Sequence, residues 1–270
     1  MLSVTATSAT KYLLEDPCSL YAQSSANPER LQSDGWGMGF YVDGALNLVK
    51  SDRPVYEERG KFTSAARQVD SEVMLAHIRR ASNPRNLPRE KIISIKNSQP
   101  FKYQNYLFAH NGTIALPDEA AESLGEWKQR IEGLNDSEVY FWYIMKAMAE
   151  GSSLREALRE FERDLEQLWQ DNRRKHPGKD RPYVGLNALL SDGEKLYAYC
   201  KCHEKDGPMR SLCLGDQPVF QMSYLISPTR LVVASEKTNR GDNWKPLKSG
   251  QLLTGMIRNR EVSIEIIEIA

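Results

Sequence analysis

The segment MGFYVDGALNLV, residues 38–49, carries the pattern that decides the fold class. Two apolar runs flank the dipeptide Asp43-Gly44. An Asp-Gly pair between such runs is a strong signal for a β-hairpin with a two-residue turn. The segment therefore predicts two neighbouring strands that run antiparallel.

The segments that follow predict more strands and then helices. Buried strands are expected at residues 72–78 and 106–110, the second ending in a turn at Asn111-Gly112. A buried helix is expected at residues 139–148, behind a group of capping residue types, and an amphipathic helix at residues 154–169. The capping residues are Asn135, Asp136 and Ser137.

The last third of the chain returns to strands. A second hairpin is expected around residues 191–193, and strands at residues 231–234, 251–257 and 262–269. The order of strands, helices and strands lacks the regular alternation of a doubly wound parallel sheet. The sequence therefore predicts an α+β fold with mainly antiparallel sheets.

Composition excludes several classes of protein. The 270 residues hold 36 Lys+Arg and 36 Asp+Glu, so the formal net charge is zero. This balance argues against binding of nucleic acid or of an anionic membrane surface, both of which need a basic excess. No apolar run approaches the roughly 20 residues of a transmembrane helix, and no secretory signal is recognisable. A cytoplasmic protein is expected.

The four cysteines do not suggest a disulfide framework in a chain of this length, so reduced thiols are expected. The alternative is a zinc site built from Cys200, Cys202, His203 and Cys213. The Cys-x-Cys spacing is tighter than the usual zinc knuckle, and residues 195–202 alternate like a strand. Free thiols are therefore favoured over a metal site.

Three segments hold unusually dense runs of Gly, His, Asn and Arg. Residues 33–39 (SDGWGMG) fit either a phosphate-cradling loop or a glycine-rich strand entry packed under a Trp. Residues 75–82 (LAHIRRAS) fit an arginine fork for a carboxylate ligand; the alternative is a structural ion pair or a strand end that reaches solvent. Residues 108–113 (FAHNGT) fit either a turn or a pair of convergent donors for an oxyanion.

In combination these segments resemble class II glutamine amidotransferases, which are N-terminal nucleophile hydrolases, and more narrowly the branch without a fused synthetase. Eight motifs carry the resemblance in order: LYAQS (20–24), SDGWGMGF (33–40), AHIRRAS (76–82), NSQPF (97–101), LFAHNGTI (107–114), NDSE (135–138), NALLSDGEKLY (187–197) and VVASE (232–236). They span essentially the whole chain, so one amidotransferase domain over residues 1–270 is expected.

The resemblance implies a four-layer αββα sandwich of two antiparallel sheets, and it implies roles for individual residues. Arg79 would bind the α-carboxylate of glutamine and Asp136 its α-ammonium. Asn111 and Gly112 would form the oxyanion hole, with Gly35 and Gly37 packed near the substrate. His77 and His110 would be structural or supporting residues.

The expected ligand is glutamine or another small γ-glutamyl compound. A separate synthetase that accepts ammonia is a further possible partner. No cofactor and no metal are expected.

The family nucleophile is a cysteine directly after the initiator Met, and its α-amine acts as the base. Here residue 2 is Leu. Cys18 cannot replace that nucleophile because its nitrogen is a peptide nitrogen without basicity. One interpretation is a glutamine-binding pseudoenzyme or interaction protein. The other, which we favour because Arg79, Asn111, Gly112 and Asp136 are all present, is that Met-Cys-Arg precedes Met1.

Overall fold

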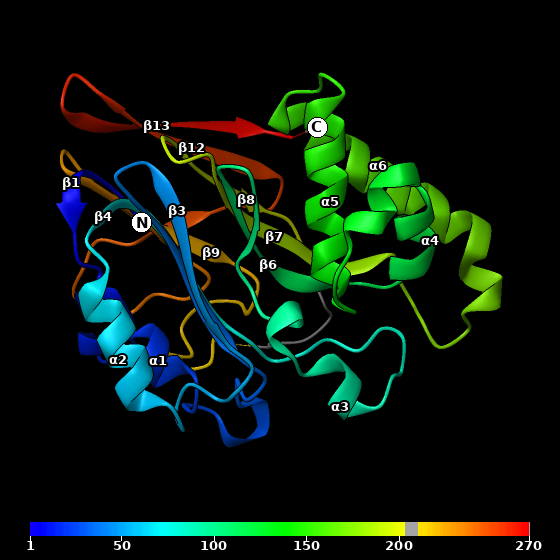
Figure 1. Ribbon diagram of the computed structural model, residues 1–270, viewed down its shortest axis with the longest axis horizontal. Helices are drawn as coiled ribbons and strands as arrows, with labels where there is room; N and C mark the ends of the chain where they lie inside the picture. The colour runs from blue at the N-terminus through cyan, green and yellow to red at the C-terminus, as the bar shows by residue number, and fades with distance from the viewer. Residues whose placement is uncertain (203–209, 270) are drawn as a thin grey trace.

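The computed structural model describes residues 1–202 and 210–269, which form two antiparallel sheets flanked by helices (Figure 1). The first sheet has seven strands. In spatial order they are β11 (Lys245–Leu247), β9 (Met222–Ser227), β10 (Arg230–Ala234), β1 (Leu2–Thr7), β4 (Ser71–Ile78), β2 (Trp36–Val42) and β3 (Ala45–Ser51).

The second sheet has six strands, and every strand pairing in both sheets is antiparallel. In spatial order its strands are β13 (Glu261–Glu268), β12 (Gln251–Arg258), β8 (Leu196–Cys200), β7 (Tyr183–Ser191), β6 (Tyr106–Ile114) and β5 (Phe101–Tyr103). The predicted α+β class with antiparallel sheets is confirmed.

The helices divide between the two outer faces. On one side lie the short α1 (Leu20–Gln23) and α2 (Arg59–Gln68); on the other lie α4 (Pro117–Glu122), α5 (Asp136–Ala149) and α6 (Leu154–Asn172) (Figure 1). A short helix, α3 (Arg89–Ile92), lies in the segment between the sheets' strands β4 and β5. No helix in the described ranges is both long enough and apolar enough to cross a bilayer.

Three apolar clusters hold these layers together. The cluster between the sheets contains Leu75 of β4 and Leu107 of β6. A second joins α5 and α6 to the six-stranded sheet, and a third joins α2 to the outer face of the seven-stranded sheet around Trp36. Three clusters separate four layers, which confirms the αββα sandwich.

Local sequence signals explain several elements. Asp43 and Gly44 both have positive φ, at 50° and 76°, which is the requirement of a type I′ hairpin turn between β2 and β3. At the start of α5, the Asn135 side chain accepts a hydrogen bond from the Ser137 N–H. The predicted hairpins, strands and helices at these places are confirmed. The glycine-rich segment before the first hairpin is the entry to β2.

Two predictions were wrong. The turn expected at Asn111-Gly112 does not form, because β6 continues through both residues and pairs them with Asn187 and Leu186 of β7. Local turn propensity was overridden by pairing across the sheet.

The expectation of reduced thiols was wrong for two of the four cysteines. Cys18 and Cys213 form a disulfide across a separation of 195 residues. Cys213 is therefore not available to join Cys200 and Cys202 in a zinc site, and His203 lies outside the described residues. The part of the chain that the structure describes contains no group of three potential metal ligands.

Candidate active site

Two adjoining cavities open where the end of β4 meets the second half of β6. The larger has a volume of about 420 Å³ and the smaller about 130 Å³. Both are lined by Ala76 and His77 from β4 and by His110 and Asn111 from β6. The fold thus brings together two of the polar segments that the sequence singled out, one from each sheet.

Arg79 lines the larger cavity and is only 3% exposed. Its Nη1 donates to the carbonyl of Asp34 at 3.2 Å and to the carbonyl of Ile92 at 3.0 Å. Burial lowers the pKa of Arg79, and the charges of Asp34 and Asp136 oppose that shift. Arg79 forms no ion pair with any carboxylate of the described chain, although a buried guanidinium is normally paired. Such a group can receive the carboxylate of a ligand.

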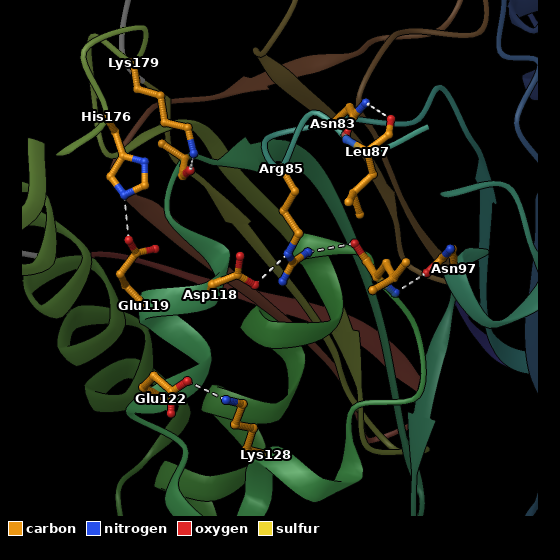
Figure 2. Close-up of polar contacts among 12 residues, drawn as sticks. Asn83, Arg85, Leu87, Asn97, Asp118, Glu119, Glu122, Lys128, His176 and Lys179 are labelled. Carbon is orange, nitrogen blue, oxygen red and sulfur yellow. Dashed lines mark hydrogen bonds and ion pairs between the residues drawn. The ribbon is translucent and has the colours of Figure 1, made fainter. Parts of the chain in front are cut away.

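The segment after Arg79 is anchored to α4 and to the start of α5 (Figure 2). Arg85 Nε donates to a carboxylate of α4 at 2.7 Å, and its Nη1 donates to the Leu134 carbonyl at 2.8 Å. The Asn97 side chain accepts a hydrogen bond from the Leu134 N–H at 2.6 Å. Ile92, whose carbonyl holds Arg79, lies between these anchors along the chain. They therefore help to fix the position of the guanidinium.

Asp136, the first residue of α5, is buried beside this cavity but is not among the residues that line it. Its Oδ1 accepts a hydrogen bond from the Ser82 hydroxyl at 2.6 Å, and its Oδ2 accepts one from the Ile114 N–H at 2.7 Å. Each carboxylate oxygen can accept a second hydrogen bond. Two neighbours of Asp136 do line the cavity: Ser82, which hydrogen-bonds to it, and Asn135, which precedes it in the sequence.

Asn111 and Gly112 lie at the cavity in the second half of β6. The Asn111 side chain is exposed, while a Cβ placed on Gly112 would lie 1.9 Å from the carbonyl oxygen of Gly185 on β7. Glycine is therefore required at 112 for close strand packing, independently of any role toward a substrate. Asn111 and Gly112 directly follow His110, whose ring and backbone form hydrogen bonds with several other residues of the site.

The His110 ring is fully buried and both of its nitrogens have partners. Nε2 lies 2.9 Å from the Gly185 carbonyl oxygen, and Nδ1 lies 2.8 Å from the Ser137 hydroxyl. Because a carbonyl only accepts, the proton sits on Nε2 and Nδ1 accepts from Ser137. Burial lowers the pKa of His110, so the ring is neutral. His110 thus anchors β6 to β7 and to α5.

His77 faces the same region from the other sheet, and one of its ring nitrogens lacks a hydrogen-bond partner. Nδ1 is buried without a hydrogen-bond partner in the described structure. Burial, with Arg79 as a lesser cause, lowers the pKa of His77 to about 3. This ring is neutral at physiological pH.

Gly35 and Gly37 line neither cavity. A Cβ on Gly35, whose φ is +120°, would lie 2.5 Å from the Ser98 hydroxyl oxygen. A Cβ on Gly37 would lie 2.4 Å from the carbonyl oxygen of Gln99. Both glycines therefore make room for the segment 98–99, and Gln99 does line the larger cavity. The motif NSQPF contained this residue, but nothing in the sequence alone gave it a role.

The smaller cavity continues the line of β1. Met1 pairs with Met74, through Met1 N to Met74 O at 2.8 Å and Met74 N to Met1 O at 3.0 Å. On the other side of β1, Leu2 pairs with Leu231 of β10. Beyond Met1 the cavity is bordered by Ala76 of β4 and by Val233 and Ala234 of β10. The slot between β4 and β10 has the place and direction of a further stretch of β1.

The disulfide lies at the edge of these cavities. The segment that contains Cys213 is also held by Glu236, which accepts hydrogen bonds from the Leu212 N–H at 2.5 Å and the Cys213 N–H at 3.4 Å. Burial raises the pKa of Glu236. Glu236 lines both cavities, so Cys18–Cys213 fixes one wall of the site.

The αββα sandwich of two antiparallel sheets is the fold type of the N-terminal nucleophile hydrolases. Residues 16–266 match the family described as "Glutamine amidotransferases class-II", so the chain belongs to that family.

Solved structures agree on the fold. A "glutamine aminotransferase class-II domain protein" from Silicibacter pomeroyi superimposes with a TM-score of 0.60 at 22% identity, over 88% of this chain and 92% of that one. Glutamine phosphoribosylpyrophosphate amidotransferase from Bacillus subtilis gives a TM-score of 0.57 at 16% identity, over 93% of this chain and 45% of that one. At these identities the likeness shows the fold alone.

Curated relatives are longer than the part they share with this chain. An uncharacterised protein of Methanocaldococcus jannaschii is 30% identical over 238 residues, which are 82% of this chain and 60% of the relative. A γ-glutamyl-hercynylcysteine sulfoxide hydrolase of Mycolicibacterium smegmatis is 33% identical over 108 residues, 38% of this chain and 44% of the relative. The matches thus span about half of each relative's length.

Proposed function

We propose that this protein hydrolyses the side-chain amide of glutamine or of another γ-glutamyl compound. The observation that carries the proposal is Arg79, a buried arginine at a cavity that pairs with no carboxylate of the described chain. In this proposal Arg79 binds the α-carboxylate of the substrate, and Asp136 binds its α-ammonium. The Asn111 side chain and the Gly112 N–H stabilise the oxyanion. Gly35 and Gly37 support the site from beneath segment 98–99.

The nucleophile in this proposal is a cysteine that stands two residues before Met1. Leu2 pairs with Val73 on β4 and with Leu231 on β10. Because both pairings are antiparallel, each residue before Leu2 lies opposite a later residue of β4 and of β10. The proposed cysteine, three residues before Leu2, would therefore lie between Ala76 and Ala234. These two alanines border the slot that leads into the site.

The Met1 amine also favours a preceding residue. It is fully buried, and burial lowers its pKa to about 5. A peptide N–H at the same position would make the same hydrogen bond to the Met74 carbonyl without burying a charge. The register and this amine together support a longer β1.

The chemistry proceeds in two steps. The α-amine of the terminal cysteine takes the thiol proton, and the thiolate attacks the γ-carbonyl carbon of the substrate. The tetrahedral oxyanion collapses, the C–N bond breaks, and the leaving amine or ammonia takes the proton from the α-ammonium. Water, activated by the same amine, then attacks the thioester, which releases glutamate and regenerates the thiol.

We further propose that an amide larger than glutamine is the physiological substrate. The volume of about 420 Å³ lies in the range of sites that hold drug-sized ligands. Two relatives carry the name γ-glutamyl-hercynylcysteine sulfoxide hydrolase, which supports a hydrolase whose end task is cleavage of a γ-glutamyl amide. Transfer of ammonia to a separate synthetase is the alternative when glutamine is the better substrate. The family match over residues 16–266 supports a single amidotransferase domain.

The test compares the chain preceded by Met-Cys-Arg with the same chain carrying serine in place of that cysteine. We expect release of glutamate from L-glutamine and from γ-glutamyl anilide by the first protein alone. The covalent thioester should appear as a mass increase in the denatured protein after a rapid quench. Binding of both compounds without turnover by either protein would refute hydrolysis and favour a glutamine-binding protein.

A further inference from the structure

Gln99 lies at a bend two residues before β5, and its side chain reaches across to β6. Phe101 of β5 lies opposite Phe108 of β6, so the chain just before β5 runs beside His110. The Gln99 Oε1 accepts a hydrogen bond from the His110 N–H at 2.6 Å, and its Nε2 donates to the His110 carbonyl at 3.1 Å. The side-chain amide thus takes the place of a neighbouring strand for the residue that precedes Asn111.

The same amide reaches the start of α5. Its Nε2 lies 3.3 Å from the Ser137 hydroxyl, which itself hydrogen-bonds to His110 Nδ1 at 2.8 Å. Ser137 directly follows Asp136. Gln99 therefore links the strand that carries Asn111 to the helix start that carries Asp136.

The surroundings of Gln99 are built to hold this arrangement. The residue is 3% exposed and lines the larger cavity. Its carbonyl oxygen occupies the space that a side chain at Gly37 would fill. The need for glycine at 37 follows from the close approach of this backbone, which explains part of the glycine-rich segment 33–39.

We propose that Gln99 is a positioning residue for the oxyanion hole, an inference that rests on the function proposed above. It does not touch the reacting atoms. By bonding both backbone groups of His110, it fixes the orientation of the peptide that leads into Asn111 and Gly112. Its bond to Ser137 keeps these donors at a constant distance from Asp136. Donors act on a transition state only when they are held in place before the reaction.

Two substitutions separate this role from a packing role. Gln99→Ala removes the amide. Gln99→Glu keeps an acceptor for the His110 N–H but, when ionised, sets a carboxylate oxygen against the His110 carbonyl. When protonated, the acid regains a donor and resembles the native amide. Gln217→Ala is the matched control, because Gln217 is also 3% exposed and its Nε2 donates to two backbone carbonyls, at 2.7 and 2.8 Å.

The pH response depends on the charges around the new carboxyl. Burial raises the pKa of an introduced acid. His110 is neutral, Lys50 and Gln99 both pack against Gly37, and Arg79 lines the same cavity as Gln99. The elements around Gln99 also carry Lys102 on β5 and Asp136, Glu138 and Lys146 on α5. They are the same in every variant, so comparison at each pH with the native protein isolates the introduced group.

With the chain preceded by Met-Cys-Arg, we expect Gln99→Ala to lower kcat for γ-glutamyl anilide about 10- to 100-fold, the loss typical of a misplaced catalytic group. KM should change less than about twofold, since Arg79 and Asp136 stay in place. Gln99→Glu should lose as much at pH 8 and recover toward the native kcat as the pH falls to 6. Gln217→Ala should be destabilised to a similar extent with a smaller loss of kcat.

Two results would overturn the proposal. One is a loss of kcat in Gln99→Ala no greater than in Gln217→Ala at equal stability. The other is a pH-independent deficit in Gln99→Glu. If the native protein with Met-Cys-Arg is inactive on both substrates, the proposed hydrolysis fails. Gln99 is then judged by NMR of the chain itself, where the Asn111 and Gly112 amide signals of Gln99→Glu should titrate toward native positions at low pH. Signals that do not titrate would refute positioning.

Discussion

The ends of β4 and β6 face each other across the same cavity. Each carries a histidine, but the two histidines differ in how completely they are hydrogen-bonded. On β6, both ring nitrogens of His110 are hydrogen-bonded and its backbone is held by Gln99. On β4, His77 has an unpartnered Nδ1, and Arg79 beyond the strand has no ion pair in the described chain. Buried polar groups whose hydrogen bonds are all formed fix the local geometry. Buried polar groups that lack partners cost stability, and we infer that they are retained to bind a ligand. We therefore propose that the end of β4 binds the substrate and that the end of β6 fixes the geometry of the site.

Replacement of Arg79 by Met tests the β4 side and should have the largest effect. We expect kcat/KM for γ-glutamyl anilide to fall about 10²- to 10³-fold, or roughly 3–4 kcal/mol. Stability should not fall by more than about 1 kcal/mol, because a buried unpaired charge is removed along with its two hydrogen bonds. The control is Arg67→Met, an exposed arginine of α2 that lines neither cavity. Equal losses in both variants would show that Arg79 is not the carboxylate-binding residue.

Replacement of His110 by Leu tests the β6 side and should act on stability. The Gly185 carbonyl and the Ser137 hydroxyl would each lose a partner in a buried place, which costs about 2–4 kcal/mol of unfolding free energy. His77→Leu is the matched variant across the cavity, and we expect a change within about 1 kcal/mol because it removes an unsatisfied nitrogen. Urea unfolding measures both. A greater loss in His77→Leu would reverse the comparison.

Much of the fold could be predicted because its signals are local. The dipeptide Asp43-Gly44 favours a tight hairpin turn, and Asn135 is a residue type that caps helices in any surroundings. The predicted turn at Asn111-Gly112 failed because the need for glycine arises from contact with Gly185, far away in sequence. The Cys18–Cys213 disulfide was not predicted for the same reason, since no local pattern joins residues that are 195 positions apart.

The site followed the same division. Residue types left both a functional and a structural interpretation open for Arg79, Asn111 and Gly112, and the resemblance to a family favoured the functional one and added Asp136. The role of Gln99 depends on register and side-chain distances, which exist only after the two sheets have formed. The sequence could therefore suggest residues that would meet a substrate, but it could not suggest the residue that holds them in place.

Substitution of Gly112 by Ala tests how tightly β6 is fixed. The added Cβ would lie 1.9 Å from the Gly185 carbonyl oxygen, so the strands must separate. We expect a loss of about 1–3 kcal/mol in unfolding free energy, the usual cost of overpacking. Gly60→Ala is the control, because a Cβ on this helical residue meets nothing within 4 Å. That change should be neutral or slightly stabilising. A neutral Gly112→Ala would mean that β6 and β7 can move apart freely.

The pH dependence of stability gives the smallest and most specific contrast. The pKa of His77 is lowered to about 3 in the folded protein, against about 6.5 when unfolded. Between these values the unfolded chain binds a proton that the native ring does not, so stability falls as the pH drops below about 6.5. For one such ring the loss is about 0.7 kcal/mol between pH 7 and pH 6, and it steepens toward 1.4 kcal/mol per pH unit. His77→Leu should lose this part of the dependence, while the part due to His110 and the carboxylates remains. Urea midpoints of both proteins from pH 7.5 to 5 measure the difference. Parallel curves would show that His77 accepts a proton in the native state, and the end of β4 would then be charged by two groups rather than by Arg79 alone.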